Sequence, residues 1–575
     1  MLRFQVEIAD ARTHHFRVTL TLPRPDPVQV FTLPVWVPGS YMVRDFSRHL
    51  SDLRASQAGQ TRVLEAIDKR CWQVHCEGHG PLVLSYLVYA NDRSVRGAFL
   101  DDSRGFFNGT SLLVCAEGRQ GQAHELAIGP LPLDWDLATA MTGAGAHRFR
   151  AGSYEELVDH PVELGRFWRG SFLAGGVRHE IVVSGALPTF DGQRLVQDTR
   201  RICEQQIAFW HGSPDARPPF SHYVFMLNAV DEGFGGLEHR SSAALMASRR
   251  DLPRQRMDGL PDGYVNLLGL ISHEYFHTWN VKRLRPRELD PIDPARENHT
   301  RLLWFFEGFT SYYDDLMLLR TGLIDLERYV KLLTRTVQAV AATPGRQVQS
   351  LADASFDAWI KFYRNDENTP NITISYYQKG ALLALALDLS LRRDGGSLDA
   401  VMRALWQSSR GGPIDEADIA LALEQIAGRS YRAELASWVH GTEDLPLADL
   451  LADLGIQWRT ERTGLAASLG LRLSEGAVSG VQVKTVLAGG AAAAAGVSAG
   501  DELLAVDGWR VRRLDDALGW IEPAQGFALL LVRDQRVITL TVVPQPDSGF
   551  ATQATLHQMA QPGRDQATRR RAWLE

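Results

Sequence analysis

Two histidines four residues apart, with a glutamate directly after the first, are the residues of this sequence best placed to do chemistry. They are His273, Glu274 and His277, in the segment Ser272–His277. Residues four apart share a face of an α-helix, so both imidazoles can reach one ion, while Glu274 can reach a water molecule on that ion. Zinc lowers the pKa of such a water to about 7, and a carboxylate can accept its proton. The pattern predicts a hydrolytic site with one zinc ion per chain and Glu274 as the general base.

A catalytic zinc usually takes a third protein ligand, and three glutamates downstream are candidates. Glu288 and Glu297 lie in a loop rich in proline and charge, where a ligand would be poorly held. Glu307 lies in the apolar stretch Leu303–Tyr313, where a carboxylate is costly unless it binds something. Gly308, next to it, lowers helix stability and indicates a close approach of another segment. We therefore expect His273, His277 and Glu307 to hold the metal.

Two helices must position these groups. Apolar residues at helical spacing predict a helix over Tyr264–Leu284 with Asp262 as N-cap, and a second over Arg301–Arg320 that Thr300 caps and Gly322 ends. Further helices are expected at Leu195–Trp210, Leu326–Ala342, Tyr377–Arg393, Leu398–Ser409 and Glu416–Ala427.

The remaining patterns indicate a multidomain α+β protein. Residues 1–165 contain short alternating runs such as Phe16–Leu22 and Leu82–Val88, which favour a β-sandwich-like domain. Residues 166–457 read as mainly helical and would form the catalytic domain. Residues 458–545 return to short strands and glycine turns, with a short helix at Ala491–Ala495, and predict a small β domain. Residues 546–575 are polar and are expected to be an exposed tail or a surface helix.

Composition excludes several classes of function. The 575 residues carry a net charge of −7 and no long basic block, so nucleic acid is not an expected partner. Neither a signal peptide nor a run of about 18 apolar residues is evident, so we expect a cytoplasmic protein without a membrane span; periplasmic export of a longer precursor stays open. The four cysteines are too few and scattered for a disulfide framework and are interpreted as reduced thiols, although Cys71 and Cys76 could pair after export.

Several segments together resemble one known family. HEYFH followed by WFFEGFTSYY is typical of gluzincin metallopeptidases, and the chain is most similar to the PDZ-containing glycyl aminopeptidases, metallopeptidase family 61. The supporting segments are Trp36–Asp45, Gly235–His239, Thr278–Arg283 and the PDZ-like residues 458–545. Two features depart from the larger gluzincin aminopeptidase family, namely a longer spacer of 29 residues between His277 and Glu307, and GGLEH in place of a GxMEN-type motif. The second departure bears on substrate preference more than on reaction class.

The resemblance implies roles for further residues within a thermolysin-like catalytic domain. Tyr377, in a YxKG motif, would donate a hydrogen bond to the oxyanion, with Tyr376 as a rival one residue away. Glu238 would receive the α-ammonium group of the substrate. Gly235 and Gly236 would let the substrate lie against the backbone as an added strand.

The implied activity is removal of N-terminal residues, with glycine or alanine favoured, from peptides with a free N-terminus. The PDZ-like domain would bind an extended chain end or internal strand, with Ser468–Leu471 as its carboxylate-binding loop, unless it is a packing appendage without a ligand. Two other functions stay open: an endopeptidase whose PDZ domain delivers protein substrates, and a non-catalytic peptide-binding scaffold. The intact metal-binding pattern argues against the scaffold.

Overall fold

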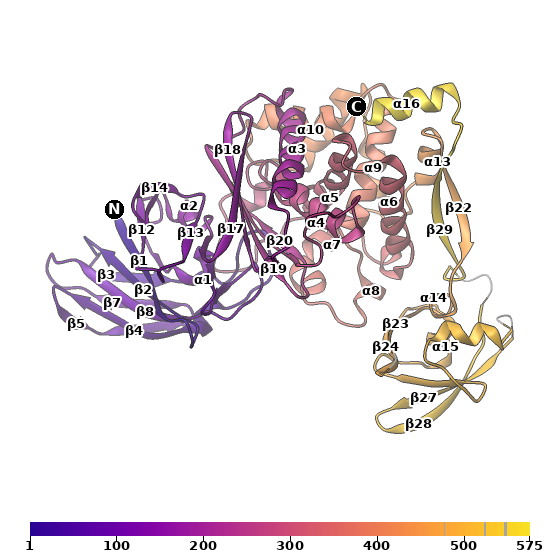
Figure 1. Ribbon diagram of the computed structural model, residues 1–575, viewed down its shortest axis with the longest axis horizontal. Coiled ribbons are helices and arrows are strands. Elements are labelled where there is room, and N and C mark those ends of the chain that lie inside the picture. Colours follow the sequence, from indigo (N-terminus) through magenta and orange to yellow (C-terminus); the bar gives the residue numbers. More distant parts are fainter. Residues whose placement is uncertain (477, 523–524, 546–548, 575) are drawn as a thin grey trace. The chain divides into compact units, whose positions relative to one another are not determined.

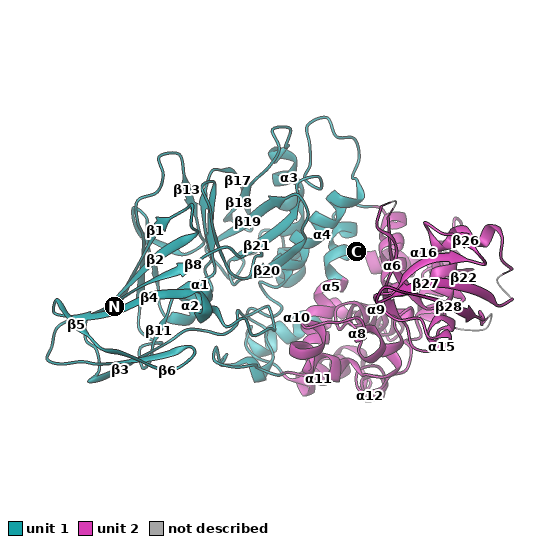
Figure 2. Ribbon diagram, turned by 90° about the horizontal axis from the view of Figure 1, so that it is seen from below, with its two compact units in different colours: residues 1–299, 313–324, 402–414 teal, residues 300–312, 325–401, 415–575 magenta. Residues whose placement is uncertain are grey.

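The computed structural model describes residues 1–476, 478–522, 525–545 and 549–574. The fold is multidomain α+β, with a β-rich N-terminal part, a central helical region and, toward the C-terminus, the small β domain predicted to be PDZ-like. The chain divides into two compact units (Figure 2). Unit 1 comprises residues 1–299, 313–324 and 402–414, and unit 2 comprises residues 300–312, 325–401 and 415–575.

Three sheets build the N-terminal part of unit 1, as the alternating runs predict. In β2 (His15–Leu22) Phe16, Val18 and Leu20 are fully buried while their neighbours are less so, which is the pattern of a strand with one face on the core. The largest sheet has the order β14 (Thr142–Gly145), β15 (Arg148–Ala151), β12 (His124–Ile128), β1 (Leu2–Asp10), β2, β8 (Leu82–Tyr89), β4 (Leu50–Gln57) and β5 (Gln60–Arg62).

Two smaller sheets complete this part (Figure 1). One has the order β13 (Asp136–Ala138), β16 (Val162–Gly165), β10 (Arg104–Phe107) and β9 (Ala98–Leu100). The other has the order β11 (Cys115–Ala116), β3 (Val28–Thr32), β7 (Cys71–His75) and β6 (Leu64–Asp68). The short helices α1 (Gly109–Leu112) and α2 (Tyr154–Val158) follow in the same region, and Ser153 caps α2 by accepting from the Glu156 N–H at 3.1 Å.

A five-stranded sheet at residues 167–248 is absent from the sequence analysis, which reads this stretch as part of a mainly helical region. Its order is β17 (Phe167–Ala174), β18 (Val177–Ser184), β19 (His222–Val230), β21 (Ser242–Ser248) and β20 (Gly235–Glu238). β18, β19 and β21 run parallel, and β20 pairs antiparallel with β21 as an edge strand. Strands buried on both faces, such as β19 with its run from Tyr223 to Leu227, lose the two-residue alternation that identifies a strand. Helix α3 (Gly192–His211) packs on this sheet.

The helix that carries the two histidines, α4 (Asp262–Phe276), is shorter than the predicted Tyr264–Leu284. Beyond it the backbone turns, because Val281 takes a left-handed φ of 108° and its N–H donates to the Leu284 carbonyl at 2.8 Å. The second helix, α5 (Leu303–Arg320), agrees with the prediction within two residues, and Gly322 follows it with a φ of +66°. The 3-10 turn η2 (Arg287–Leu289) lies between the two helices.

The helical part of unit 2 follows its sequence periodicity closely. Its helices are α6 (Leu326–Ala341), η3 (Pro344–Gln347), α7 (Leu351–Phe356), η4 (Ala358–Phe362), α8 (Thr369–Ile372), α9 (Gln378–Arg393), α11 (Glu416–Ala427), α12 (Arg432–Trp438) and α13 (Leu447–Ala452). Helix α10 (Leu398–Ser409) begins in unit 2 and continues into unit 1 from residue 402. α5 and α9 approach closely, because a Cβ on Gly308 would lie 2.5 Å from the Gly380 Cα and 2.9 Å from the Tyr376 carbonyl oxygen. The glycine beside Glu307 thus permits the close approach that the sequence indicates.

Of the two expectations for the polar C-terminal residues, an exposed tail or a surface helix, the structure shows a mostly exposed helix at residues 564–574. β29 (Thr552–Gln558) pairs antiparallel with β22 (Ile456–Arg462), and α16 (Arg564–Leu574) buries Trp573 completely, with its indole N–H donating to the Tyr312 hydroxyl at 2.9 Å. Burial of the large Trp573 side chain stabilises the docked helix, although most other residues of the segment are polar. The PDZ domain is therefore an insertion between β22 and β29, and a truncation before it would also remove β29 and α16.

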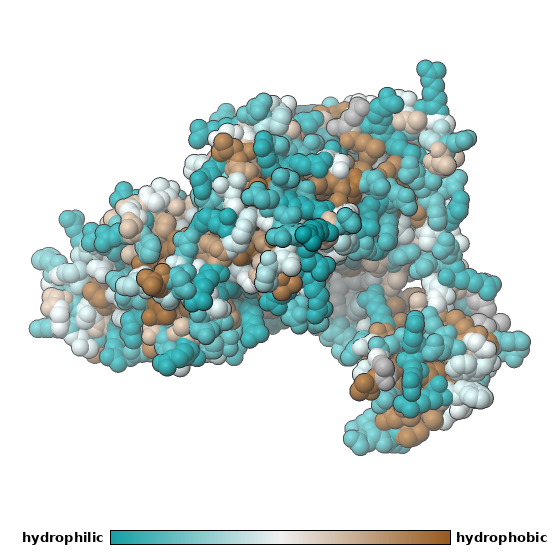
Figure 3. Space-filling view, viewed as in Figure 1, coloured by the Kyte–Doolittle hydropathy of each residue, from teal (hydrophilic) through white to brown (hydrophobic). Residues whose placement is uncertain are grey.

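The PDZ domain itself has its own small core. Its elements are α14 (Leu465–Ser468), β23 (Leu471–Gly476), β24 (Gly480–Val486), α15 (Ala491–Ala495), β25 (Glu502–Val506), β26 (Trp509–Arg510), η5 (Leu514–Gly519), β27 (Phe527–Arg533) and β28 (Arg536–Val542). β23 is an edge strand of its sheet. In the space-filling view of Figure 3 the visible face is mostly hydrophilic with scattered hydrophobic residues. Within the described ranges, no helix combines the length and the apolar character needed to cross a membrane.

The contact between α5 and α9 leads to a first prediction. Gly308→Ala places a methyl group against the α9 backbone and should destabilise the protein by about 1–3 kcal/mol, in spite of the better helix propensity of alanine. Thermal or denaturant unfolding of the purified variant measures this. Gly519→Ala in η5 is the matched control, because no atom lies within 4 Å of the added Cβ, and it should leave stability unchanged. Equal stability of both variants would contradict the close packing.

Candidate metal and substrate site

The two histidines of α4 point their Nε2 atoms at each other across 3.1 Å. The His277 Nδ1 lies 2.7 Å from the Asn280 backbone oxygen, which accepts only, so Nδ1 carries the proton. The His273 Nδ1 lies 3.0 Å from Asp314 Oδ2 and donates to it in the same way. Both Nε2 atoms then present lone pairs to the same point, and a cation at that point would bind both.

Glu307 is the third member of the candidate metal site. One ligand atom from each of His273, His277 and Glu307 lies within 4.8 Å of the others, and among the described residues no other set of three or more groups meets this condition. Two nitrogens that each bind zinc at 2.0–2.1 Å in tetrahedral geometry stand about 3.3 Å apart, close to the spacing seen here. Glu307 is 2% exposed, so its charge needs a partner of opposite sign. The donors and their spacing fit zinc with one position left open.

Glu274 lies beside the metal-binding face and against the edge strand β20. A Cβ added to Gly236 would stand 2.0 Å from Glu274 Oε1, so the strand can pass the carboxylate only with glycine at this position. Glu274 is 5% exposed. From the N-terminal part, the Arg96 guanidinium donates to the Gly236 carbonyl at 3.4 Å. The structure thus brings Gly236 and Glu274, two of the predicted site residues, into contact.

Glu238 lies two residues further along β20 and points to the same face of the strand, at a spacing of roughly 6.6 Å from Gly236. It is 4% exposed, and its Oε1 is buried without a hydrogen-bond partner in the part of the chain that the structure describes. Gly39, with a φ of +98°, presses its backbone on this carboxylate, since a Cβ there would lie 2.4 Å from Oε1. A buried carboxylate oxygen without a donor is favourably placed to accept a hydrogen bond from a cationic group.

A cavity of about 260 Å³ opens beside Glu238 within unit 1. Its walls are largely apolar and come from the loop Pro34–Tyr41 and from residues 281–294. The polar side chains on its wall include Asp159, His239 and Lys282. Such a concave apolar space with a few convergent polar groups is typical of a ligand site.

Comparison with known proteins agrees with this geometry. Family models match the M61 peptidase N-terminal domain at residues 3–166, the M61 glycyl aminopeptidase at residues 266–383 and a PDZ domain at residues 457–526. An aminopeptidase N family protein from Idiomarina loihiensis is 34% identical with a TM-score of 0.93, over 100% of both chains. The chain belongs to the M61 glycyl aminopeptidase family. It is therefore a peptidase, a hydrolase of peptide bonds.

Other comparisons add little to this assignment. An M1 zinc metallopeptidase from Deinococcus radiodurans is 14% identical with a TM-score of 0.47, covering 78% of this chain and 94% of its own. The curated proteins contain no sequence that matches this M61 peptidase.

Tyr377 and its neighbour Tyr376 differ in exposure in this M61 peptidase. Tyr376 is fully buried and packs on Phe362, whereas Tyr377 is half-buried and its hydroxyl lies 3.4 Å from that of Tyr363. Burial and the negative charge of Glu307 hold the pKa of Tyr377 well above its usual value. The phenol therefore stays protonated, which is the state that donates a hydrogen bond. Of the two candidates, Tyr377 is the more exposed.

Sequence reasoning missed Asp314, which orients His273. Asp314 lies seven residues after Glu307 on α5, and that spacing places both on one helix face, a signal the sequence does contain. Asp159 and Arg96 were missed as well, and no local pattern marks them. His239, the residue after Glu238, bonds Asp159 through Nδ1 at 3.2 Å. The side chains of Glu288 and Glu297 are exposed and stand outside the metal group.

The third metal ligand can be tested directly. Glu307→Ala should lower metal affinity severely, because it removes a buried ligand, whereas Glu297→Ala should leave it unchanged, because that side chain is exposed in a loop. Metal content after dialysis against a graded chelator series measures the difference. The reverse order of the two variants would refute the assignment of Glu307.

The Asp314 contact predicts a smaller and separable effect. Asp314→Asn keeps the size of the side chain but removes the charge that accepts the His273 Nδ1–H, and we expect metal affinity to fall about 10–100-fold. Competition with a chromophoric chelator measures the affinity. Asp353→Asn, which neutralises an exposed carboxylate paired with Arg301, is the control and should bind metal as the unaltered protein does. An Asp314→Asn variant with full affinity would show that the hydrogen bond does not orient the ligand.

Proposed function

We propose that this protein is a zinc-dependent aminopeptidase that removes N-terminal residues, with small ones such as glycine and alanine favoured, from peptides with a free N-terminus. Family membership supports the reaction class, and the preference for small residues rests on the family alone. The observation that carries the exopeptidase assignment is the buried Oε1 of Glu238 without a hydrogen-bond partner, two strand residues from the contact between Gly236 and Glu274. An α-ammonium group on Glu238 places the first peptide bond near Glu274.

Each described group has a task in this reaction. His273, His277 and Glu307 would hold the zinc ion, one per chain, which when bound supplies a Lewis acid and lowers the pKa of water. Glu274 accepts a proton from the attacking water and passes it to the leaving amine. Tyr377 donates its hydroxyl hydrogen to the developing oxyanion.

The edge strand β20 supports the binding mode. Its outer edge is unpaired within its sheet, so a peptide backbone can add to it as a further strand. Gly235 has a φ of +155° and Gly236 carries no side chain, so the substrate can approach the backbone closely. Arg96 donates to the Gly236 carbonyl and steadies the strand at this point.

The PDZ domain supplies the observation behind a second function, an endopeptidase to which that domain delivers protein chains. β23 is an edge strand, and Gly470 in the loop before it has a φ of +76°, as expected for a groove that takes an extended peptide or chain terminus. We propose that this groove binds a peptide, whether the enzyme is an aminopeptidase or an endopeptidase.

The four cysteines, which are too few and scattered for a disulfide framework, favour action in the reducing cytoplasm.

Acetylation of the substrate separates the two functions. Losing one partner of a buried charged hydrogen bond costs roughly 2–5 kcal/mol, so an acetylated alanyl anilide should show a kcat/KM at least about 30-fold below that of the free amine. Glu238→Ala should slow the free substrate and narrow this gap. The measurement is kcat/KM for the free and the acetylated substrate, with the unaltered enzyme and with Glu238→Ala.

Glu274→Gln is the companion variant, because it should keep the metal and lose turnover. A protein that cleaves the acetylated substrate as fast as the free one is an endopeptidase, and the exopeptidase proposal then fails.

A further inference from the structure

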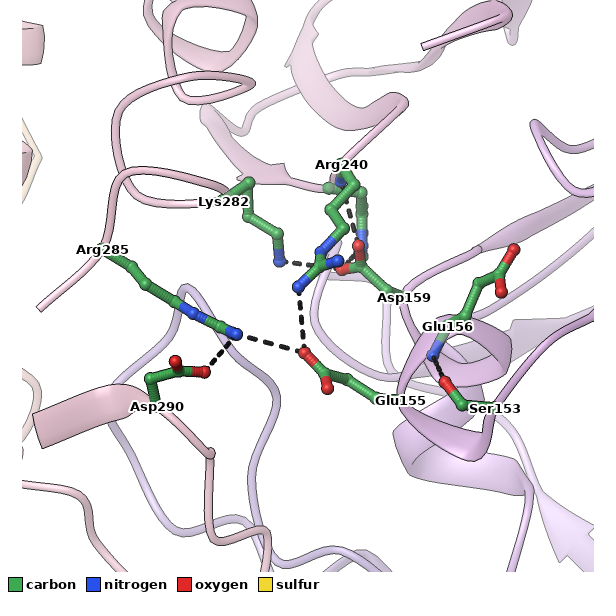
Figure 4. A network of polar contacts seen from close by, with 9 residues as sticks. Ser153, Glu155, Glu156, Asp159, Arg240, Lys282, Arg285 and Asp290 are labelled. Carbon is green, nitrogen blue, oxygen red and sulfur yellow. Dashed lines mark hydrogen bonds and ion pairs between the residues drawn. The ribbon is translucent and has the colours of Figure 1, made fainter. Parts of the chain in front are cut away.

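The charged side chains around the cavity are arranged so that each cation has an acidic partner. Figure 4 shows Arg240 and Arg285 both directed at Glu155, and Arg285 also at Asp290. The Arg240 Nη2 stands 3.1 Å and the Arg285 Nη1 3.3 Å from Glu155 Oε1.

Lys282 is paired in the same way. Its Nζ lies 2.7 Å from Asp159 Oδ1, and both residues line the cavity. Among the carboxylates on the cavity wall, only Glu238 has no ion pair within the described part of the chain. The wall therefore presents one carboxylate that has no ion-pair partner among the described residues.

Asp159 accepts several hydrogen bonds besides its ion pair with Lys282. It ends helix α2, and it also accepts from the Arg240 backbone N–H at 3.0 Å and from the His239 Nδ1 at 3.2 Å. Its side chain is 13% exposed and that of Lys282 is 8% exposed, so the pair is shielded from water. Burial would raise the pKa of Asp159, but Lys282 and His239 hold it well below its usual value. The carboxylate is thus charged wherever the enzyme is folded near neutral pH.

Lys282 and Glu238 lie on the wall of one cavity of about 260 Å³. A lysine ammonium is a point charge with rotatable donors on a flexible four-carbon stem, so a Lys282 that loses its acid can pair with another carboxylate of the same cavity. A Lys282 ammonium on Glu238 would occupy the same oxygen as a substrate ammonium. Any device that keeps the two apart therefore determines whether the amine site is available.

We propose that Asp159 is a positioning residue that holds Lys282 away from Glu238 and so reserves the Glu238 carboxylate for the substrate's N-terminal ammonium. The inference rests on the proposed aminopeptidase function. It assigns to α2, an element of the N-terminal part, a role in selecting free amines. It also explains why a lysine on the wall of the same cavity pairs with Asp159 and not with Glu238.

The test is the effect of Asp159→Asn in two backgrounds. In the otherwise unaltered enzyme, D159N frees the Lys282 ammonium to pair with Glu238, and kcat/KM for an alanyl anilide should fall at least tenfold, chiefly through KM. In the K282M background no cation is released, and adding D159N should change kcat/KM less than threefold. A double-mutant cycle isolates this coupling. Asp159→Glu, which keeps the charge, should retain most of the KM of the unaltered enzyme.

Controls separate this role from a structural one. Glu156→Gln removes a charge from the same helix, on a side chain that Figure 4 shows pointing away from the network, and it should leave KM unchanged. Metal content and unfolding temperature are measured for every variant. A merely structural Asp159 would give the same loss in both backgrounds, and that result overturns the inference.

Two further outcomes keep the test decisive. If D159N alone does not fold, the D159N/K282M variant, which replaces the ion pair by uncharged groups, takes its place. Retained preference of this variant for the free over the acetylated substrate supports the inference. Loss of that preference overturns it. If the unaltered enzyme itself shows no such preference, the proposed aminopeptidase function fails first. The two failures are therefore distinguishable.

Discussion

Two imidazole nitrogens that face each other at 3.1 Å, with a buried carboxylate beside them, set the main constraint on this structure. Without a cation at their focus the lone pairs and the charge would repel one another in a poorly solvated place. The surroundings fix this arrangement. The Asn280 carbonyl and the Asp314 carboxylate each accept a hydrogen bond from the Nδ1–H of one histidine and so aim its Nε2 at the focus.

The backbone around the focus is shaped by glycine. Gly308 lets α5 approach α9 at the residue next to Glu307, and Gly236 lets β20 pass against the Glu274 carboxylate. A methyl group at either position would collide with the facing segment. Glycine has a low propensity for helices and strands, so each of these positions lowers local stability. It also lets another segment or side chain approach the backbone, which is common near a ligand or a catalytic group.

The charged side chains on the wall of the cavity beside Glu238 are almost all paired. Every lysine and arginine on the wall of the cavity has an acidic partner, and among the described carboxylates of that wall Glu238 is the one without an ion pair. A substrate ammonium would complete the balance. The N-terminal part is needed for this, because it supplies Asp159 to Lys282, Gly39 to Glu238 and Arg96 to Gly236.

Much of the catalytic helix structure could be predicted from the sequence. α6, α10 and α11 begin and end within one residue of the expected positions, since a helix repeats every 3.6 residues and is satisfied by its own backbone hydrogen bonds. The pattern from His273 to His277 defines one face of such a helix, and the apolar setting of Glu307 identifies it over Glu297. The spacing of the two histidines, and the cost of burying a carboxylate in an apolar helix, were enough to predict which side chains form this group.

Only the tertiary structure decided the rest. The sheet β17–β21 is hidden in continuous apolar runs, and β29 and α16 return to the helical core because Trp573 finds a buried partner there. Asp159 meets Lys282 across 123 residues of sequence. No periodicity encodes such a contact, because the energy of an ion pair depends on which charges folding brings together and how far it removes them from water. The sequence by itself thus determined the metal-binding pattern and its helices, while folding determined which carboxylate stays available to the substrate.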